Sequence, residues 1–142
     1  MGGDGQMKAL SVSSGFAALF GDQKTIEFRT WETSHRGELL ICSNGDLVPG
    51  TIARHALHIV DLKEVRPFTR KDMDAACLDT APGKGYAWVF DYVCPVVPFK
   101  VRGKPGLFDV EDRLIQRVNE AEMSSEEIDA YIREHIIPLL TA

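Results

Sequence analysis

Residues 21–41 read GDQKTIEFRTWETSHRGELLI and carry more information about the architecture than any other stretch of the chain. Their first half alternates apolar and charged residues, and successive side chains of a β-strand point to opposite faces. The pattern therefore predicts a strand with Ile26 and Phe28 on one face and Glu27 and Arg29 on the other. The apolar face is expected to pack, while the charged face meets water or carries chemistry.

Short strands and helices are expected on both sides of this stretch. Apolar and β-branched residues predict further strands at residues 8–12, 37–43, 51–62, 86–99 and 107–110. Helical spacing predicts helices at residues 15–20, 69–78, 111–121 and 125–140, and it is a second option for 51–62. Capping boxes are expected from Thr69 with Asp72 and from Ser124 with Glu127. Five or six short strands with interposed helices indicate an α+β fold built on a closed or partly closed barrel.

The charged residues of 21–41 belong to an ordered motif. Gly21 leads to Lys24, Glu27 and Arg29, and then come Trp31, Thr33 and the trio His35-Arg36-Gly37. The segments MKALSV at 7–12, YAWVF at 86–90 and VRGKPGLFDV at 101–110 complete the series. Together these segments resemble the ASCH domain family over residues 7–110. The resemblance implies a small PUA-like β-barrel of five or six strands with short flanking helices. One departure is that Asp22 and Gln23 separate the glycine from the lysine, where the family usually has one residue.

One domain with a helical tail is expected, because 142 residues suit a single core. Residues 1–6 are interpreted as a flexible leader or a cloning remnant, 7–110 as the barrel, and 111–142 as an acidic helical extension packed on the barrel. The charges are distributed unevenly between these parts. Residues 1–108 carry 13 Lys+Arg and 12 Asp+Glu, whereas residues 109–142 carry 3 and 9. The tail therefore accounts for the net charge of −5.

A local basic groove is compatible with this acidic average. Basic residues gather at Lys24, Arg29 and Arg36, at Arg54, Lys63, Arg66, Arg70 and Lys71, and at Lys100, Arg102 and Lys104. The alternative is a solvated surface of mixed charge.

The resemblance implies RNA contact through a groove beside the barrel, so we expect a polar pocket at the barrel mouth that binds RNA or a nucleotide or nucleobase. Arg29 offers bidentate donors for phosphate or a base edge. Burial and Arg29 would lower the pKa of Lys24, whereas Glu27 would raise it. The expected binding residues are Lys24, Glu27, Arg29, Trp31, Arg36 and Lys104. Trp31, Trp88 and Phe108 are candidate stacking faces, although Trp88 fits the core better. Alternatively, Glu27 and Arg29 bridge the barrel mouth and anchor neighbouring strands.

An enzyme is the first alternative, because some ASCH proteins are amidohydrolases of N-acylated cytidine. Lys24 would then be the base, with Glu27 beside it, but Glu27 stands where the family has its threonine. A further carboxylate could come from Asp61, Glu64 or Asp91. A ribonuclease is a weaker alternative, since the motif supplies no acidic metal ligands. In the third interpretation, the C-terminal helices dock a protein or form a homodimer.

Several other classes are disfavoured. No apolar stretch reaches the ~20 residues needed to cross a bilayer, so no membrane partner is expected. Cys42, Cys77 and Cys94 form no CxxC pair, and they are interpreted as reduced thiols of a cytoplasmic protein. His55 and His58 would point to opposite faces of a strand, which argues against a metal site. No cofactor is predicted.

Overall fold

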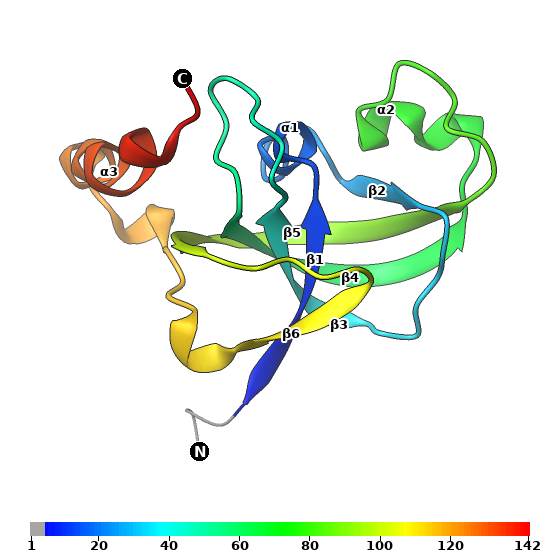
Figure 1. The fold of residues 1–142 in the computed structure, drawn as a ribbon, viewed down its shortest axis with the longest axis horizontal. Helices are drawn as coiled ribbons and strands as arrows, with labels where there is room; N and C mark the ends of the chain where they lie inside the picture. The colour runs from blue at the N-terminus through cyan, green and yellow to red at the C-terminus, as the bar shows by residue number, and fades with distance from the viewer. Residues whose placement is uncertain (1–4) are drawn as a thin grey trace.

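The structure is a computed structural model that describes residues 5–142. It contains a six-stranded mixed sheet in the order β2-β5-β4-β3-β1-β6, in which β1 and β3 are parallel and the other neighbours antiparallel. The strands are β1 (Gln6–Val12), β2 (Ile26–Arg29), β3 (Gly37–Ser43), β4 (His55–Pro67), β5 (Tyr86–Lys100) and β6 (Leu107–Glu111). The helices are α1 (Ser14–Ala17), α2 (Met73–Ala76) and α3 (Ser125–Tyr131) (Figure 1). The α+β prediction is confirmed.

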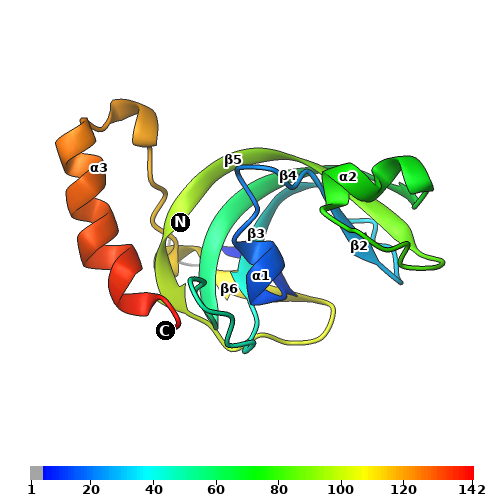
Figure 2. The same cartoon turned by 90° about the horizontal axis from the view of Figure 1, so that it is seen from above.

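The sheet curves into a barrel shape but does not close by strand pairing. Figure 2 shows β4 and β5 arching over α1. The edge strands are β2 and β6, which form no ladder with each other. Of the predicted leader, residues 1–4 lie outside the described residues, and β1 already begins at Gln6. None of the helices in residues 5–142 combines the length and the apolar character needed to span a bilayer.

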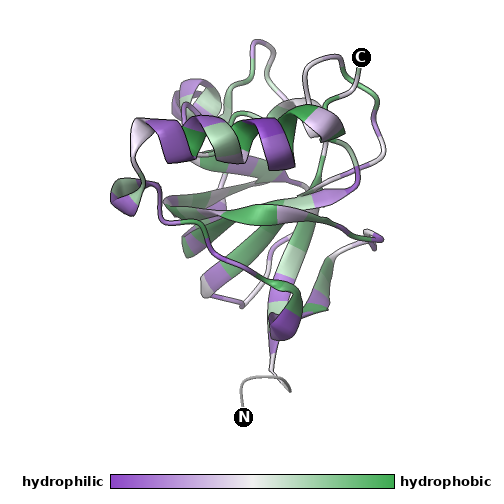
Figure 3. Cartoon of the chain, turned by 90° about the vertical axis from the view of Figure 1, so that its left-hand side faces the viewer, coloured by the Kyte–Doolittle hydropathy of each residue, from purple (hydrophilic) through white to green (hydrophobic). Residues whose placement is uncertain are grey.

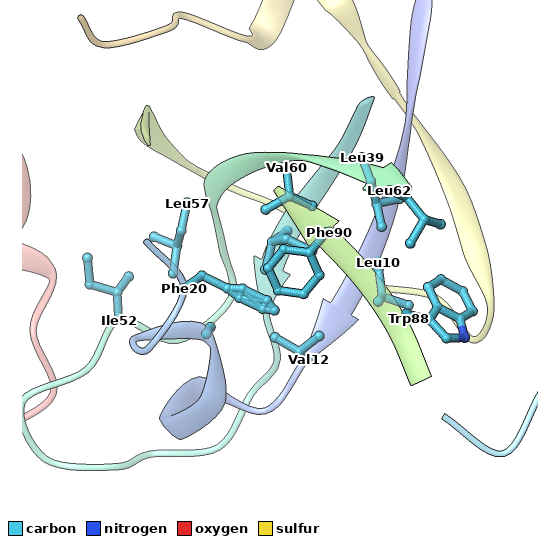
Figure 4. Close-up of a cluster of buried hydrophobic side chains, with 12 residues drawn as sticks. Leu10, Val12, Phe20, Leu39, Ile52, Leu57, Val60, Leu62, Trp88 and Phe90 are labelled. Carbon is cyan, nitrogen blue, oxygen red and sulfur yellow. The ribbon is translucent and has the colours of Figure 1, made fainter. Parts of the chain in front are cut away.

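Two apolar clusters occupy opposite faces of the central strands. In β1, Leu10 and Val12 belong to the first cluster, whereas Ala9 belongs to the second. This division follows from the alternation of strand side chains. In the first cluster the ring of Phe20, which follows α1, stacks on Phe90 of β5 at 4.8 Å between centroids (Figure 4). The short helix α1 thus covers one face of the sheet.

Strand β4 begins later and runs further than the predicted 51–62. Its first residue is His55 because Arg54 has a left-handed backbone, with φ of 61°, which ends the preceding loop. Register shifts in the β4–β5 pairing bend these two long strands. Pro95 and Pro98 lie in the part of β5 that β2 does not reach, where a missing N–H donor is tolerated.

The predicted helix at 111–121 is wrong. Only two single 3-10 turns form, at Asp112–Leu114 and Glu120–Glu122, and the chain between them is extended. Tertiary pairing overrides the helical pattern here. The free edge of β5 offers Val97 N, which donates to Gln116 O at 2.8 Å, and Pro95 O, which accepts from Val118 N at 2.9 Å. Val118 is buried by this pairing.

The C-terminal helical segment, residues 125–139, begins with α3 and continues through a wider turn at Ile132–Ile136 and a 3-10 turn at Ile137–Leu139. Its capping box is confirmed, since Glu127 N donates to Ser124 Oγ at 3.1 Å and Ser124 N to the Glu127 carboxylate at 2.9 Å. Figure 3 shows this segment lying across the barrel, with hydrophilic and hydrophobic residues interleaved. The predicted cap at Thr69 is also present.

Candidate functional site

Lys24 is a buried cation at the entrance to β2. The residue is 2% exposed. Its ammonium donates to Ala76 O at 2.6 Å and pairs with Glu27 Oε1 at 3.2 Å. It also lies 4.4 Å from the centroid of the Phe16 ring, at cation–π distance. Lys24 therefore ties the turn before β2 to the end of α2.

The environment of Lys24 lowers its pKa. Burial is the dominant cause, because it disfavours the charged amine, and the Glu27 carboxylate opposes it by attraction and by accepting a hydrogen bond. A lysine in such a place gives up its proton more readily than one on the surface. The side chain is nevertheless almost sealed from solvent, so a substrate would reach the amine only after α2 or α1 moved.

Glu27 and Arg29 continue this cluster along the same face of β2, as the alternation predicted. Arg29 Nη2 lies 3.1 Å from Glu27 Oε2 and donates to Ser11 O of β1 at 2.8 Å. The two strands are not neighbours in the sheet, so this guanidinium links them across the curve. Arg29 Nε is buried and has no hydrogen-bond partner within residues 5–142. The cluster supports the strand-bridging interpretation and leaves one donor free.

A basic groove includes Ser11 in its lining. It has a volume of about 740 Å³ and is lined by Ser11, Ser43, Asn44, Gly45, Arg54, Lys100, Val101, Arg102, Gly103 and Lys104. Sheet topology explains this gathering. Parallel strands β1 and β3 end at the same edge, where antiparallel β4 starts and β5 ends. The groove is thus one mouth of the barrel.

The groove is positively charged without compensation. Its lining holds four cations, Arg54, Lys100, Arg102 and Lys104, and no acidic side chain. None of the four forms an ion pair with any part of the chain from residue 5 onward. Such a surface favours an anion.

Arg54 contributes to this lining from a strained backbone position. Its φ of 61° is uncommon for a residue with a Cβ atom. Two backbone hydrogen bonds hold it there, from Arg54 N to Asn44 O and from Val101 N to Arg54 O, both at 2.9 Å. A Cβ atom at Gly45 would lie 2.8 Å from Arg54 Nη2, so the glycine makes room for the guanidinium. Strain at such a position points to a function for the side chain.

Comparison with known proteins is consistent with this architecture. The family model of the ASCH domain matches residues 15–136. The chain belongs to the ASCH domain family. The crystal structure of ASCH from Zymomonas mobilis superposes with a TM-score of 0.55 at 14% identity, over 90% of this chain and 94% of that one. A tyrosine-to-phenylalanine variant of the same bacterial protein gives 0.53 at 12% identity, over 90% and 97%.

A serine-to-alanine variant from Zymomonas mobilis gives a TM-score of 0.50 at 12% identity, over 89% of this chain and 94% of that one. At these identities the likeness shows the fold, which is PUA-like. No curated protein matches the chain.

The remaining motif residues of this ASCH domain do not reach the groove. Trp31 packs edge-on against Trp88 at 4.8 Å, and its carbonyl accepts from Trp88 Nε1 at 3.2 Å. Trp88 and Phe108 are both buried in the core, so neither offers a stacking face. Arg36 donates to carbonyls of its own loop and precedes β3, whereas Ser43 ends it. At ~3.3 Å per residue the two positions are about 20 Å apart.

The candidate carboxylates and histidines have structural partners. Asp61 and Asp91 face each other in the β4–β5 register, and Lys63 lies 2.8 Å and 3.8 Å from them. Glu64 pairs with Arg66 at 3.3 Å. The ring of His58 contacts Tyr92 Oη at 2.8 Å and Ala17 O at 3.1 Å, and His55 contacts Ala53 O at 2.7 Å. Across residues 5–142, no three metal-ligating side chains come together.

Proposed function

We propose that this ASCH domain binds single-stranded RNA or a nucleotide through phosphate groups in the basic groove. The observation that carries the proposal is the set of four cations around the barrel mouth, with no carboxylate among the lining residues. Arginine binds phosphate bidentately, and lysine binds it as a point charge. Because the whole chain is acidic, the positive potential is local, and the ligand would be directed to this mouth.

Phosphate contacts would dominate over base stacking. The three aromatic residues considered as stacking faces are engaged in the core or against it. Arg29 lies outside the groove lining but donates to the backbone carbonyl of Ser11, which belongs to that lining. Lys24, Glu27 and Arg29 would then act indirectly, by holding Ser11 of the groove lining in place. An RNA or nucleotide ligand also agrees with the predicted cytoplasmic location.

Binding of a labelled short single-stranded RNA, followed by fluorescence anisotropy, tests the proposal. Four phosphate contacts predict that raising salt from about 50 mM to about 200 mM weakens binding about 50-fold. Replacing Arg54 and Arg102 by glutamine should lower the salt slope by about one per residue. Lys71→Gln is the matched control, because Lys71 is exposed and outside the groove lining. Equal losses in the groove variant and the control would contradict the proposal.

Hydrolysis of an N-acylated cytidine is the second candidate function. One observation favours it, the pKa of Lys24, which burial lowers toward that of a usable base. Chromatography of N-acetylcytidine incubated with the protein would detect cytidine. Lys24→Met keeps the volume of the side chain and should abolish conversion, with circular dichroism as the check on folding. Absence of conversion by the wild type removes this candidate.

Self-association through the C-terminal helical segment stays a prediction. Ile137, 52% exposed, and Ile132, 39% exposed, leave apolar surface on this segment. A homodimer that used this surface would elute earlier than a monomer, and Ile137→Glu would shift it back. Deleting the tail is a poor test, because buried Val118 belongs to the barrel packing.

A further inference from the structure

A second recess lies between the C-terminal helical segment and the barrel. We call it the helix pocket. Its volume is about 300 Å³, at the lower end of the range for small-molecule sites. Leu57, His58 and Val96 line it from the barrel, and Ile128, Tyr131 and Ile132 from the helix. It shares no lining residue with the basic groove.

Backbone hydrogen bonds at both ends of the helical segment hold this pocket open. Before the segment, the extended chain pairs with β5 through Val97 N to Gln116 O and Val118 N to Pro95 O. After it, Thr141 N donates to Thr51 O at 2.8 Å and Gly50 N to Thr141 O at 2.9 Å. The helix is therefore a strap fixed at its two ends. The space beneath it is part of the folded architecture.

The polar groups of the helix pocket define what it can accept. Tyr131 Oη is buried and has no hydrogen-bond partner among the described residues. His58 is engaged through both ring nitrogens, and burial lowers its pKa to about 4, so it is neutral near pH 7. Glu120 is the one charged residue in the lining, which contains neither lysine nor arginine. The pocket thus combines an apolar body, one free hydroxyl and one carboxylate.

Glu120 and Tyr131 line the same pocket, Glu120 from the turn before the helix and Tyr131 from α3. Burial raises the pKa of Tyr131, and the Glu120 charge raises it further. Tyr131 stays protonated, and its oxygen keeps lone pairs to accept a hydrogen bond. The surrounding tail carries an excess of acidic residues, so the local field favours a cation over an anion.

We propose that the helix pocket binds a small organic amine, with its apolar body under the C-terminal helix and its ammonium between Tyr131 Oη and the Glu120 carboxylate. The hydroxyl gains the partner that the protein does not provide, and the carboxylate supplies the opposite charge. A carboxylate ligand of the same shape is excluded by repulsion from Glu120. This site is independent of RNA or nucleotide binding in the basic groove.

Three probes of matched shape test the proposal, phenethylamine, phenethyl alcohol and hydrocinnamate. Each is titrated into the full chain while amide NMR chemical shifts are followed. Phenethylamine should saturate in the millimolar range and shift resonances of Leu57, His58 and the 120–136 segment. Phenethyl alcohol should bind about three- to tenfold more weakly, and hydrocinnamate should not saturate.

Two variants connect the result to the proposed contacts. Glu120 is exposed, so the Glu120→Gln variant should fold normally. Its affinity for phenethylamine should fall to the affinity of the wild type for phenethyl alcohol. Tyr131→Phe should weaken the binding of both phenethylamine and phenethyl alcohol. The proposal is overturned if all three probes bind equally, if none binds, if the shifts map to the basic groove, or if a second copy of the chain fills the pocket in solution.

Discussion

The basic groove and the helix pocket are two recesses of one small barrel with opposite chemistry. The groove is lined by four cations at strand ends, whereas the pocket is lined by apolar side chains and one carboxylate. This difference reflects how charge is distributed along the sequence, since the barrel is nearly neutral and the tail after residue 108 is strongly acidic. The helical strap thus encloses a second recess whose lining has a charge opposite to that of the groove.

A change in the cluster of Lys24, Glu27 and Arg29 should have the largest effect, and it should affect binding in the basic groove but not in the helix pocket. Glu27 lies between buried Lys24 and partly exposed Arg29, so Glu27→Gln leaves both cations without their counter-charge. We expect the free energy of unfolding in urea to fall by about 3 kcal/mol. RNA affinity should fall as well, because Arg29 loses the group that orients it beside Ser11. Binding of phenethylamine in the helix pocket should be unaffected under conditions where the variant is folded.

Two further variants control this result. Glu64→Gln removes an exposed carboxylate that also pairs with an arginine, and it should change stability little. Lys24→Met with Glu27→Leu replaces the ion pair by apolar side chains and should recover part of the loss. If the Glu27→Gln variant were as stable as the wild type, the cluster of Lys24, Glu27 and Arg29 would not anchor the strands.

Lowering the pH should reduce the free energy of unfolding through His58, which lines the helix pocket. Burial lowers the pKa of His58 to about 4 from its ordinary value of 6.5, so folding excludes a proton that the unfolded chain binds. This contribution to stability is fully present above pH 6.5 and is lost as the pH falls toward 4. Since the ring keeps some solvent contact, we expect a loss of about 2 kcal/mol.

Urea unfolding at pH 7 and at pH 4.5 would measure this loss. His58→Gln should be less stable than the wild type at pH 7 but should show a smaller drop on acidification. His35→Gln is the control on the surface loop before β3 and should keep the full drop. Identical pH profiles for the wild type and the His58 variant would show that another group senses the acid.

Local signals in the sequence predicted local structure well. The run Gly37–Ser43 is a strand, and the capping boxes at Thr69 and Ser124 form, because each depends on residues close in sequence. The helix prediction for residues 111–121 was wrong for the opposite reason, since the structure of this segment depends on pairing with the distant strand β5. The cluster of Lys24, Glu27 and Arg29 was also accessible from one short motif.

The basic groove could not be predicted from the sequence in the same way. Arg54 and Lys100 are adjacent in space only because β3, β4 and β5 alternate in direction and bring their ends to one edge. Their positive charge was visible in the sequence, but their convergence with Lys104 required the topology. Arg36 and Trp31 were included with the site for their nearness in the motif, and the length of β3 separates Arg36 from the groove.

The smallest expected effect distinguishes a ligand-binding arginine from a structural one. Arg54 has a left-handed backbone, so Arg54→Gly should relieve strain and raise the free energy of unfolding by about 1 kcal/mol, while weakening RNA binding. Arg54→Ala keeps the strain and should weaken RNA binding equally without the gain in stability. Anisotropy titrations and urea unfolding of both variants make the test. If glycine destabilised the fold, the arginine side chain would be holding the Gly45 loop in place, and its position in the groove would have a structural explanation.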